Sequence, residues 1–380
     1  MAYDDINIRF NRDTMEIQEL AHNRQVQSFL EYATQSGQKI ADNVETQYGV
    51  LSSNEHVFPL TQNDQEYANC YVVSPYSAYI DYACEELRSL RSKVFILPMQ
   101  GLIRGVAPIL RLARVNKAIH INNWLLSTNL FPKWDGSDLT LITSKLIERF
   151  PDRFLYFRSL NHFSNKNLMA CFVENGYRLI PARQVYIFDM PPSGWDRKVN
   201  TQRDMRLLET TNLLHVKNNE FKASDWDRVR ELYDALYLQK YTRLNPQFTA
   251  EFLKWGQKEK LFTFEGYRDH QGVLQAIVGT FGYQGTLTAP FVGYNTKLPK
   301  SMGLYRLLMA RVFRQACEIG IPLNLSAGAA SFKRLRGGKP FIEYTAVYDR
   351  HLSVYRRSTM TILDTLLNLV GVPIMRKFNL

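Results

Sequence analysis

Three successive segments in the second half of the chain constrain the fold most, because each is rich in β-branched and aromatic residues and turn formers separate them. These segments are 261–268, 272–283 and 286–296. They predict an antiparallel meander. A helix is predicted over 302–319, because Pro299 precedes it and Gly320 follows it, and a short apolar strand over 321–327 comes next. A strand, a helix and a strand in this order predict a right-handed crossover, which gives the meander one parallel neighbour.

The first half shows a similar order of elements toward its end. Its predicted strands are 118–130, 153–160 and 177–189, and its predicted helices are 137–150 and 165–175. In the second half, helices are predicted at 225–241 and 248–258 before the meander, and a short helix near 329–336 and a last strand over 341–349 after the crossover.

The two halves also share a short motif at the same joint between a strand and a helix. Residues 131–136 read FPKWDG, and residues 298–303 read LPKSMG. A chain of 380 residues has room for two or three domains at about 150 residues each. We therefore predict an internal duplication and an α/β (α+β) fold of two tandem domains, each a mixed, mostly antiparallel sheet flanked by helices. The predicted divisions are a domain 1–190, a linker 191–211, a domain 212–350 and a helical tail 351–380.

The second copy of the joint has the composition of a phosphate-binding loop. A loop that opens a helix presents unpaired backbone N–H groups and the positive end of the helix dipole. Lys297, Lys300 and Arg306 supply positive charge there, and Gly303 allows the backbone to approach a ligand closely. The first copy carries Asp135 instead, so a phosphorylated donor is expected in the second half. A simple βα turn with solvated lysines would give the same pattern.

Two motifs resemble known transferase families. Lys300-x-x-Gly303 is similar to the Q/R-x-x-G-x-G/A loop of the GNAT superfamily, with Tyr305 where the second small residue belongs. Residues 332–338, FKRLRGG, resemble the F-K-x-x-x-G-G signature of the FemAB-like transferases, which are double-GNAT proteins. The resemblance implies two GNAT-like domains that pass an activated acyl or aminoacyl group to an amine.

The transfer reaction needs a cation for the developing oxyanion and a group that takes the proton of the amine. Lys333 is the candidate cation, and Tyr294 and Glu343 are the candidate proton carriers. Alternatively, Lys333 belongs to a solvated basic run, and the other two have packing or surface roles. The expected donor-binding residues are Phe291, Val292, Gly293, Lys297, Lys300, Gly303 and Arg306.

The predicted strand 118–130 is unusually polar near its end. Asn122, Asn123, Ser127 and Asn129 interrupt an otherwise apolar segment. They are candidates for lining the site of the acceptor. The alternative is that they face water from a sheet edge or make turn hydrogen bonds.

The charge favours anionic partners, because 47 Lys and Arg against 36 Asp and Glu give a net charge of +11. We expect no metal and no permanently bound cofactor, since the histidines show no ligand spacing. Acyl-CoA, an acyl carrier protein or an aminoacyl-tRNA is the expected donor, and a small-molecule amine is the expected acceptor. One alternative is an aminoacyl-tRNA-dependent FemAB-type peptidyltransferase of cell-wall synthesis. A different class, a non-enzymatic RNA-binding module, would also suit the charge and the 48 aromatic residues.

A hydrolase is a further alternative, because residues 324–328, NLSAG, are one residue short of a G-x-S-x-G nucleophile elbow. The predicted antiparallel strands upstream oppose it.

The sequence favours a bacterial cytoplasmic protein. The four cysteines form no C-x-x-C motif, and no signal peptide or transmembrane segment is predicted. Residues 358–370 predict a short apolar helix that ends before Gly371 and Pro373, with basic residues on both sides. This helix either makes a peripheral contact with the inner face of the membrane, through 358–378, or packs in the core.

Overall fold

A computed structural model describes residues 6–10, 23–35, 37–53, 56–88 and 93–378. The chain forms two compact units. Unit 1 comprises the described residues of Met1–Gln38, Asn43–Gln184 and Phe341–Leu380, and unit 2 comprises Lys39–Asp42 and Val185–Pro340.

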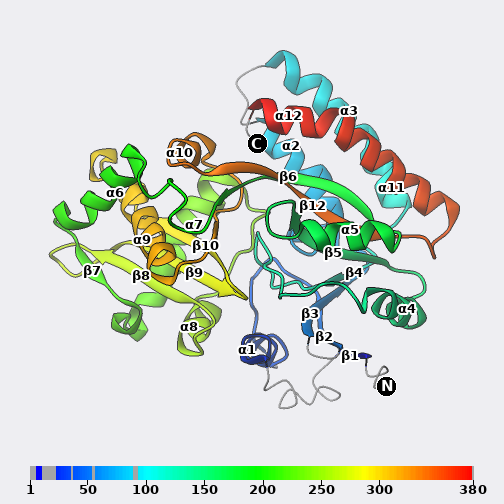
Figure 1. Ribbon diagram of the computed structural model, residues 1–380, viewed down its shortest axis with the longest axis horizontal. Coiled ribbons are helices and arrows are strands. Elements are labelled where there is room, and N and C mark those ends of the chain that lie inside the picture. Colours follow the sequence, from blue (N-terminus) through cyan, green and yellow to red (C-terminus); the bar gives the residue numbers. More distant parts are fainter. Residues whose placement is uncertain (1–5, 11–22, 36, 54–55, 89–92, 379–380) are drawn as a thin grey trace. The chain divides into compact units, whose positions relative to one another are not determined.

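Unit 1 contains a sheet with the strand order β1-β2-β3-β4-β5-β12-β6 (Figure 1). Its pairs are antiparallel from β1 to β4 and between β5 and β12, whereas β4 and β5 are parallel and are joined through helix α4. The strands are β1 (Ile6–Phe10), β2 (Gln47–Ser53), β3 (His56–Asn63), β4 (Ala118–Ile121), β5 (Phe154–Asn161), β6 (Arg178–Phe188) and β12 (Lys339–Tyr348).

Helices cover the sheet of unit 1, and each face has its own hydrophobic core. Helices α4 and α5 pack on one face through Leu139, Ile142 and Phe172. Helices α3 and α11 pack on the other face through Leu110 and Met360. The helices of the unit are α1 (Arg24–Ala33), α2 (Ala83–Arg88), α3 (Lys93–Leu112), α4 (Leu139–Arg149), α5 (Lys166–Glu174), α11 (Val354–Leu366) and α12 (Val372–Phe378), with π-helical turns η3 (Ser77–Tyr82) and η8 (Leu367–Gly371).

Unit 2 contains the predicted meander and crossover. Its strand order is β6-β11-β10-β9-β8-β7, in which β10 and β11 are parallel and the other recorded pairs are antiparallel. Helix α9 makes the crossover. The further elements are β7 (Leu214–Val216), β8 (Thr263–Arg268), β9 (Leu274–Tyr283), β10 (Thr286–Tyr294), β11 (Leu323–Asn324), α6 (Val199–Thr210), α7 (Trp226–Leu236), α8 (Ala250–Lys258), α9 (Leu304–Ile319) and α10 (Ala330–Arg334), with a π-helical turn η6 (Tyr237–Tyr241). The predicted fold class, mixed and mostly antiparallel sheets flanked by helices, is confirmed.

Strands β6 and β12 determine where the units divide. Strand β12 lies near the end of the chain but pairs with β5 of unit 1, from Glu343 opposite Asn161 to Tyr348 opposite Leu155. The end of β6 pairs with β11 of unit 2. Residues 341–380 therefore belong to unit 1, whereas we predicted that the second domain continues to residue 350 and that a separate tail follows. The predicted linker contains helix α6.

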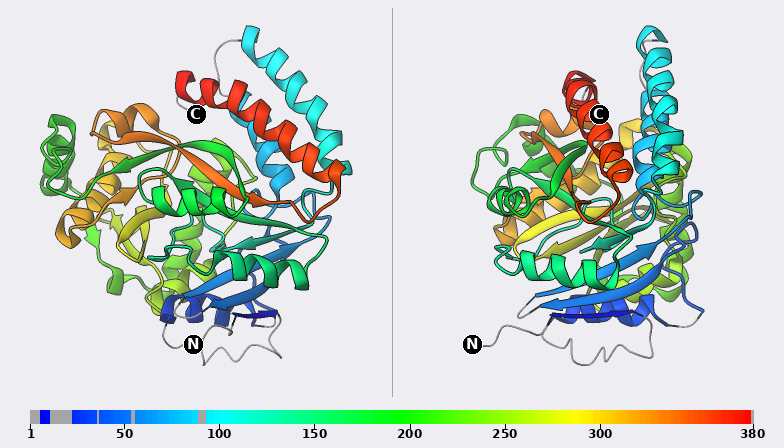
Figure 2. Two further views of the ribbon diagram at one scale, coloured as in Figure 1. Left: turned by 45° about the vertical axis from the view of Figure 1, so that its right-hand side comes forward. Right: turned by 90° about the vertical axis from the view of Figure 1, so that its right-hand side faces the viewer.

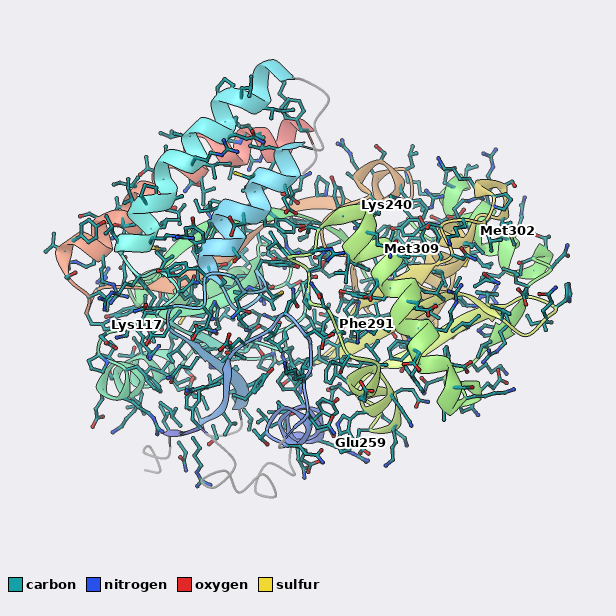
Figure 3. All side chains as sticks on the ribbon, turned by 180° about the vertical axis from the view of Figure 1, so that it is seen from behind. Lys117, Lys240, Glu259, Phe291, Met302 and Met309 are labelled. Atoms are coloured by element: carbon teal, nitrogen blue, oxygen red, sulfur yellow. The ribbon has the colours of Figure 1, made fainter. Side chains whose placement is uncertain are left out.

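An aromatic cluster fills the core of unit 2 around Phe291 of β10 (Figure 3). The ring centroid of Phe291 lies 4.7 Å from that of Phe262 and 5.0 Å from that of Phe248. Two residues along, Gly293 meets α7 so closely that a Cβ would lie 2.5 Å from the backbone of Leu232 and Tyr233. Glycine is therefore needed at Gly293 so that the helix can lie directly on the strand.

Two predicted elements have different limits in the structure. The predicted strand 118–130 ends at Ile121, because Asn122 turns the backbone with a φ of 59° and donates from Nδ2 to the carbonyl of Leu130. The tail helix begins at Val354 rather than near Ser358, and it continues through η8 into α12. Pro373 lies two residues after η8, where the π-helical turn already interrupts the regular i→i−4 hydrogen bonds of the helix.

Candidate active site

Unit 1 contains an apolar cavity of about 140 Å³ beneath its terminal helices. Its wall comes from η3, α2, α3 and the continuous tail helix, so segments from distant parts of the chain enclose it. The lining residues are Ala78, Tyr79, Ile80, Tyr82, Ala83, Glu86, Leu87, Met99, Leu102, Ile103, Val106, Ala182, Leu363, Leu366, Leu367, Val370, Gly371, Ile374 and Met375. The size and the apolar wall suit an aliphatic chain.

Two π-helical turns contribute to this wall. Tyr79 and Tyr82 lie on η3, and Leu367 and Gly371 lie on η8. A π-helical turn widens the helix locally, and such turns occur frequently at functional sites. The backbone therefore departs from regular α-helical geometry at both turns, η3 and η8, where they line the apolar cavity.

A smaller polar cavity of about 50 Å³ adjoins the apolar one, and Ala78, Tyr79, Tyr82 and Ala182 line both. Ala182 is exposed, so the two cavities meet near the surface of unit 1. The remaining lining residues of the polar cavity are Tyr71, Pro75, His120, Tyr156, Arg158, Arg183, Glu343 and Thr345. The arrangement places an apolar compartment next to a charged one.

Arg183 and Glu343 form a buried ion pair in the polar cavity. Nε of Arg183 donates to Oε1 of Glu343 at 2.8 Å, and Nη2 donates to Oγ1 of Thr128 at 2.9 Å. Burial disfavours the charge of Arg183, but Glu343 and the nearby tyrosines outweigh this effect and raise the pKa of the guanidinium. The guanidinium of Arg183 is therefore charged.

His120 and Arg158 lie in the same cavity. The ring of His120 stacks on Tyr156 with centroids 5.1 Å apart, and its Nδ1 is buried without a hydrogen-bond partner. Burial and the charge of Arg158 lower the pKa of His120 to about 3, so the imidazole is neutral at pH 7. Nη1 of Arg158 donates to the carbonyl of Val72 at 3.1 Å and to Oδ1 of Asn123 at 3.3 Å.

Tyr79 lies at the boundary of the two cavities, and Glu86 lines the apolar one. Burial raises the pKa of Tyr79 to about 12, although a hydrogen bond with Thr345 opposes the shift. Burial raises the pKa of Glu86 to about 7 despite its hydrogen bond with Tyr82. A carboxyl group that is half protonated near neutral pH suits an apolar wall better than a fixed charge does.

The polar residues that follow β4 contact side chains that line the polar cavity. Asn123 donates from Nδ2 to Thr61 Oγ1 and to the carbonyl of Val72, and it also accepts from Arg158. Ser127 accepts from the hydroxyl of Tyr71 at 2.8 Å, and Asn122 and Asn129 hold the turn around Trp124. None of the four predicted residues lines either cavity, and Asn123 and Ser127 bond to side chains that line the polar one, so their acceptor-lining role stays a prediction.

Lys333 has a different environment from the one we predicted. Its side chain is buried in unit 2, and Nζ donates to the carbonyls of Leu325 at 2.7 Å, Ser326 at 3.2 Å and Ala327 at 2.8 Å. An ammonium group has three donors, so these bonds use all of them. These bonds hold the turn after β11, and the burial of the side chain rules out the alternative of a solvated surface charge. The oxyanion-binding role of Lys333 stays a prediction.

The other catalytic candidates are separated between the units. Tyr294 is half-buried at the end of β10 in unit 2, where its ring lies 6.3 Å from that of Tyr305. Glu343 lies in unit 1 and lines the polar cavity. Within unit 1, Glu343 is therefore grouped with Arg183 and His120 rather than with Lys333.

The predicted donor-binding residues divide into buried and exposed groups. Phe291 and Val292 are buried in the core of unit 2, and Gly293 is covered by α7. Their side chains therefore have structural roles. Lys297 and Lys300 are exposed, as a phosphate site requires.

The start of α9 is less open than its sequence suggests. Gly303 has a φ of 63° and precedes the helix, and a Cβ there would lie 3.1 Å from Leu207 of α6. Arg306 donates from Nε to the buried carboxylate of Asp204 at 2.7 Å, and Asp204 also accepts from Arg336. Part of the positive charge at this loop is thus neutralised inside unit 2.

Our reading of the sequence missed Arg158, Arg183 and His120. The available signal was a charged or polar residue within an otherwise apolar strand, as Arg158 is within FLYFRSLN. Such residues are rarely buried without a partner or a function. Among the residues that the structure describes, no group of three or more His, Cys, Asp and Glu side chains is placed to hold a metal ion.

Comparison with known proteins gives structural neighbours only. No family model and no curated protein matches the sequence. The structure of L-PGS from Bacillus licheniformis is 17% identical, with a TM-score of 0.44, over 60% of this chain and 77% of that chain. FemX is 8% identical, with a TM-score of 0.43, over 56% and 77%. A tandem GNAT protein from the clavulanic acid biosynthesis pathway is 10% identical, with a TM-score of 0.40, over 90% and 98%.

Proposed function

We propose that this protein is an acyltransferase that moves an acyl group from an activated carrier, acyl-CoA or an acyl carrier protein, to a small-molecule amine. The observation that carries the proposal is the pair of adjoining cavities in unit 1. The apolar cavity suits the acyl chain, and the polar cavity suits the carbonyl group and the attacking amine. The two compartments meet at Ala182, where the chain would pass from one to the other.

The residues of the polar cavity can supply the chemistry of the transfer. The nitrogen of the amine forms a bond to the carbonyl carbon, and the bond from that carbon to the sulfur of the carrier breaks. The amine gives up a proton, and the departing thiolate gains one. Nδ1 of His120 is buried without a hydrogen-bond partner, so it is the proposed hydrogen-bond acceptor that orients an N–H of the amine. Its pKa of about 3 makes it too weak a base to hold the proton, which the departing thiolate takes.

Arg158 is the proposed partner of the developing oxyanion. Its recorded hydrogen bonds come from Nη1, which leaves Nε and Nη2 without a bond to the described residues. A fixed guanidinium in a site of low dielectric stabilises an oxyanion strongly. The ion pair of Arg183 and Glu343 would fix the geometry of the cavity and orient the amine.

The test is a transfer assay with the whole chain, acyl-CoA donors from acetyl to palmitoyl and a pool of small amines, with product detection by mass spectrometry. Ala182→Trp should lower the use of long-chain donors at least tenfold, because the new side chain obstructs the junction of the cavities. Ala223→Trp, at an exposed alanine of unit 2, is the matched control and should leave turnover unchanged. Equal rates in all three proteins would contradict the assignment of the cavity.

The aminoacyl-tRNA-dependent alternative is tested in the same assay. Its supporting observation is the net charge of +11, which suits a nucleic acid. Transfer from charged tRNA, without transfer from any acyl-CoA or acyl carrier protein, would favour this alternative. Salt-dependent RNA binding without transfer from any donor would favour a binding module.

A further inference from the structure

Two helices from opposite parts of the chain form one surface of unit 1, which we call the helical face. It consists of α3 and of the continuous tail helix Val354–Phe378. The two lie side by side in both views of Figure 2, and buried Val106 and Leu110 of α3 share a core with Met360 and Leu363 of the tail. This shared core fixes α3 and the tail helix together.

Large apolar side chains are exposed on the helical face. Leu97 and Leu112 of α3 are 72% and 73% exposed, and Leu369 of the tail helix is 71% exposed. Leu102 and Ile362 are exposed as well. Single exposed leucines are ordinary, but a group of them on two neighbouring helices indicates an interaction surface.

Basic residues outnumber acidic ones on the two helices. Helix α3 contains three Lys or Arg and no Asp or Glu. Arg104 and Arg111 of α3 are exposed, as is Arg114 just after it. In the tail, residues 350–380 contain five Lys or Arg, and Asp364 is their acidic residue. Exposed leucines among basic residues complement an anionic lipid surface, which offers hydrocarbon below phosphate.

The tail helix is long and apolar enough to cross a membrane by length and composition, and 28% of its most apolar window is buried. Its inner side, however, belongs to the core of unit 1, because Met360 is fully buried and Leu363 is nearly so. A spanning orientation would remove these side chains from their partners on α3. The helix is therefore suited to lie on a bilayer.

We propose that the helical face docks unit 1 on an anionic membrane, with Leu97, Leu112 and Leu369 inserted among the lipids. The inference goes beyond the proposed transfer reaction. The apolar cavity is lined by α3 and by the tail helix, so docking places the cavity next to the acyl chains of the bilayer. A long-chain substrate could then reach the site without crossing water.

The test is flotation of the whole chain with vesicles of phosphatidylcholine, with and without phosphatidylglycerol. We expect flotation with the anionic vesicles and little with the neutral ones. Leu97→Asp combined with Leu369→Asp should weaken binding at least tenfold. Val199→Asp combined with Leu335→Asp, at unit 2 leucine and valine side chains of similar exposure, should not. Circular dichroism and thermal melting confirm that each variant is folded.

The docking proposal would be overturned if the folded wild type did not float with the vesicles, or if the control variant lost as much binding as the leucine variant. A third contradicting outcome is that the protein does not float but binds an RNA, and that the leucine substitutions leave this RNA binding unchanged. The last outcome would assign the basic face to nucleic acid. Flotation needs no turnover, so its failure leaves the transfer reaction untouched, and a failed transfer assay leaves docking untouched.

Discussion

Buried cations occur in both units, and their surroundings differ. Lys333 of unit 2 donates to three backbone carbonyls, and Asp204 binds both Arg306 and Arg336. These bonds occupy Nζ of Lys333, whereas the side chain of Arg306 stays 44% exposed. In unit 1 the buried charges of Arg183 and Glu343 border the polar cavity, which adjoins the apolar one. Burial of a charge does not mark a candidate site by itself, whereas a buried charge that faces an open volume next to an unpartnered imidazole does.

The largest expected effect is the loss of Arg183. Arg183→Leu leaves Glu343 buried without its cation, and we expect the free energy of unfolding to fall by about 3–5 kcal/mol. Urea denaturation measures it. The double variant with Glu343→Leu should recover much of the stability, because no uncompensated charge remains. It should not recover transfer activity. Recovery of both would reduce the pair to a structural role.

Lys333→Ala tests the buried cation of unit 2, which is bonded to backbone carbonyls. Three carbonyls lose a charged donor in a buried turn, so we expect the free energy of unfolding to fall by about 1–3 kcal/mol. The kcat/KM per folded molecule should be unchanged. A large drop in kcat/KM with unchanged stability would return Lys333 to the oxyanion role that the sequence suggested, and it would weaken the distinction between saturated and open sites.

The pH dependence of stability tests the environment of His120. Its folded pKa, lowered to about 3, lies below the unfolded value, so between these values the unfolded state binds more protons and stability falls as the pH is lowered. The slope from this residue is up to about 1 kcal/mol per pH unit below pH 6.5. His120→Phe should reduce the slope measured by denaturation from pH 7 to pH 5. An unchanged slope would mean that the imidazole is not buried and neutral.

The smallest expected effect concerns the two copies of the joint between strand and helix. Lys300 of unit 2 and Lys133 of unit 1 are exposed at corresponding positions. If a phosphorylated donor uses the second copy, Lys300→Glu should weaken donor binding about two- to fivefold, which is typical of one exposed charge. Lys133→Glu should have no effect. Calorimetric titration with CoA measures both, and equal effects would remove the difference between the copies.

The first copy of the joint shows why its sequence resembles the second without sharing its properties. Trp134 donates from Nε1 to Asp138 at 2.6 Å, and Ser53 donates to the same carboxylate. A Cβ on Gly136 would lie 2.7 Å from Sγ of Cys171. These contacts fill the loop with side chains of unit 1, so its glycine serves packing rather than the approach of a ligand.

The sequence by itself determined the local elements whose pattern is strong. Strands β8, β9 and β10 and the crossover helix α9 were predicted within a few residues, because alternating apolar residues and turn formers act over short distances. The front of unit 1, including α3, was not predicted. Its prolines, Pro98 and Pro108, lie inside a helix where local rules place breaks, and tertiary packing overrides that preference.

Only the tertiary structure decided which strand joins which sheet and where the charged residues meet. In the sequence, Glu343 follows Lys333 among the consecutive elements predicted for the second half of the chain. In the structure, β12 pairs with β5, so Glu343 lies beside Arg183 of β6 in unit 1. The two residues are 160 positions apart. No local pattern encodes such a pairing, because it joins two strands that lie far apart in the sequence. The candidate site exists only once β12 has paired with β5.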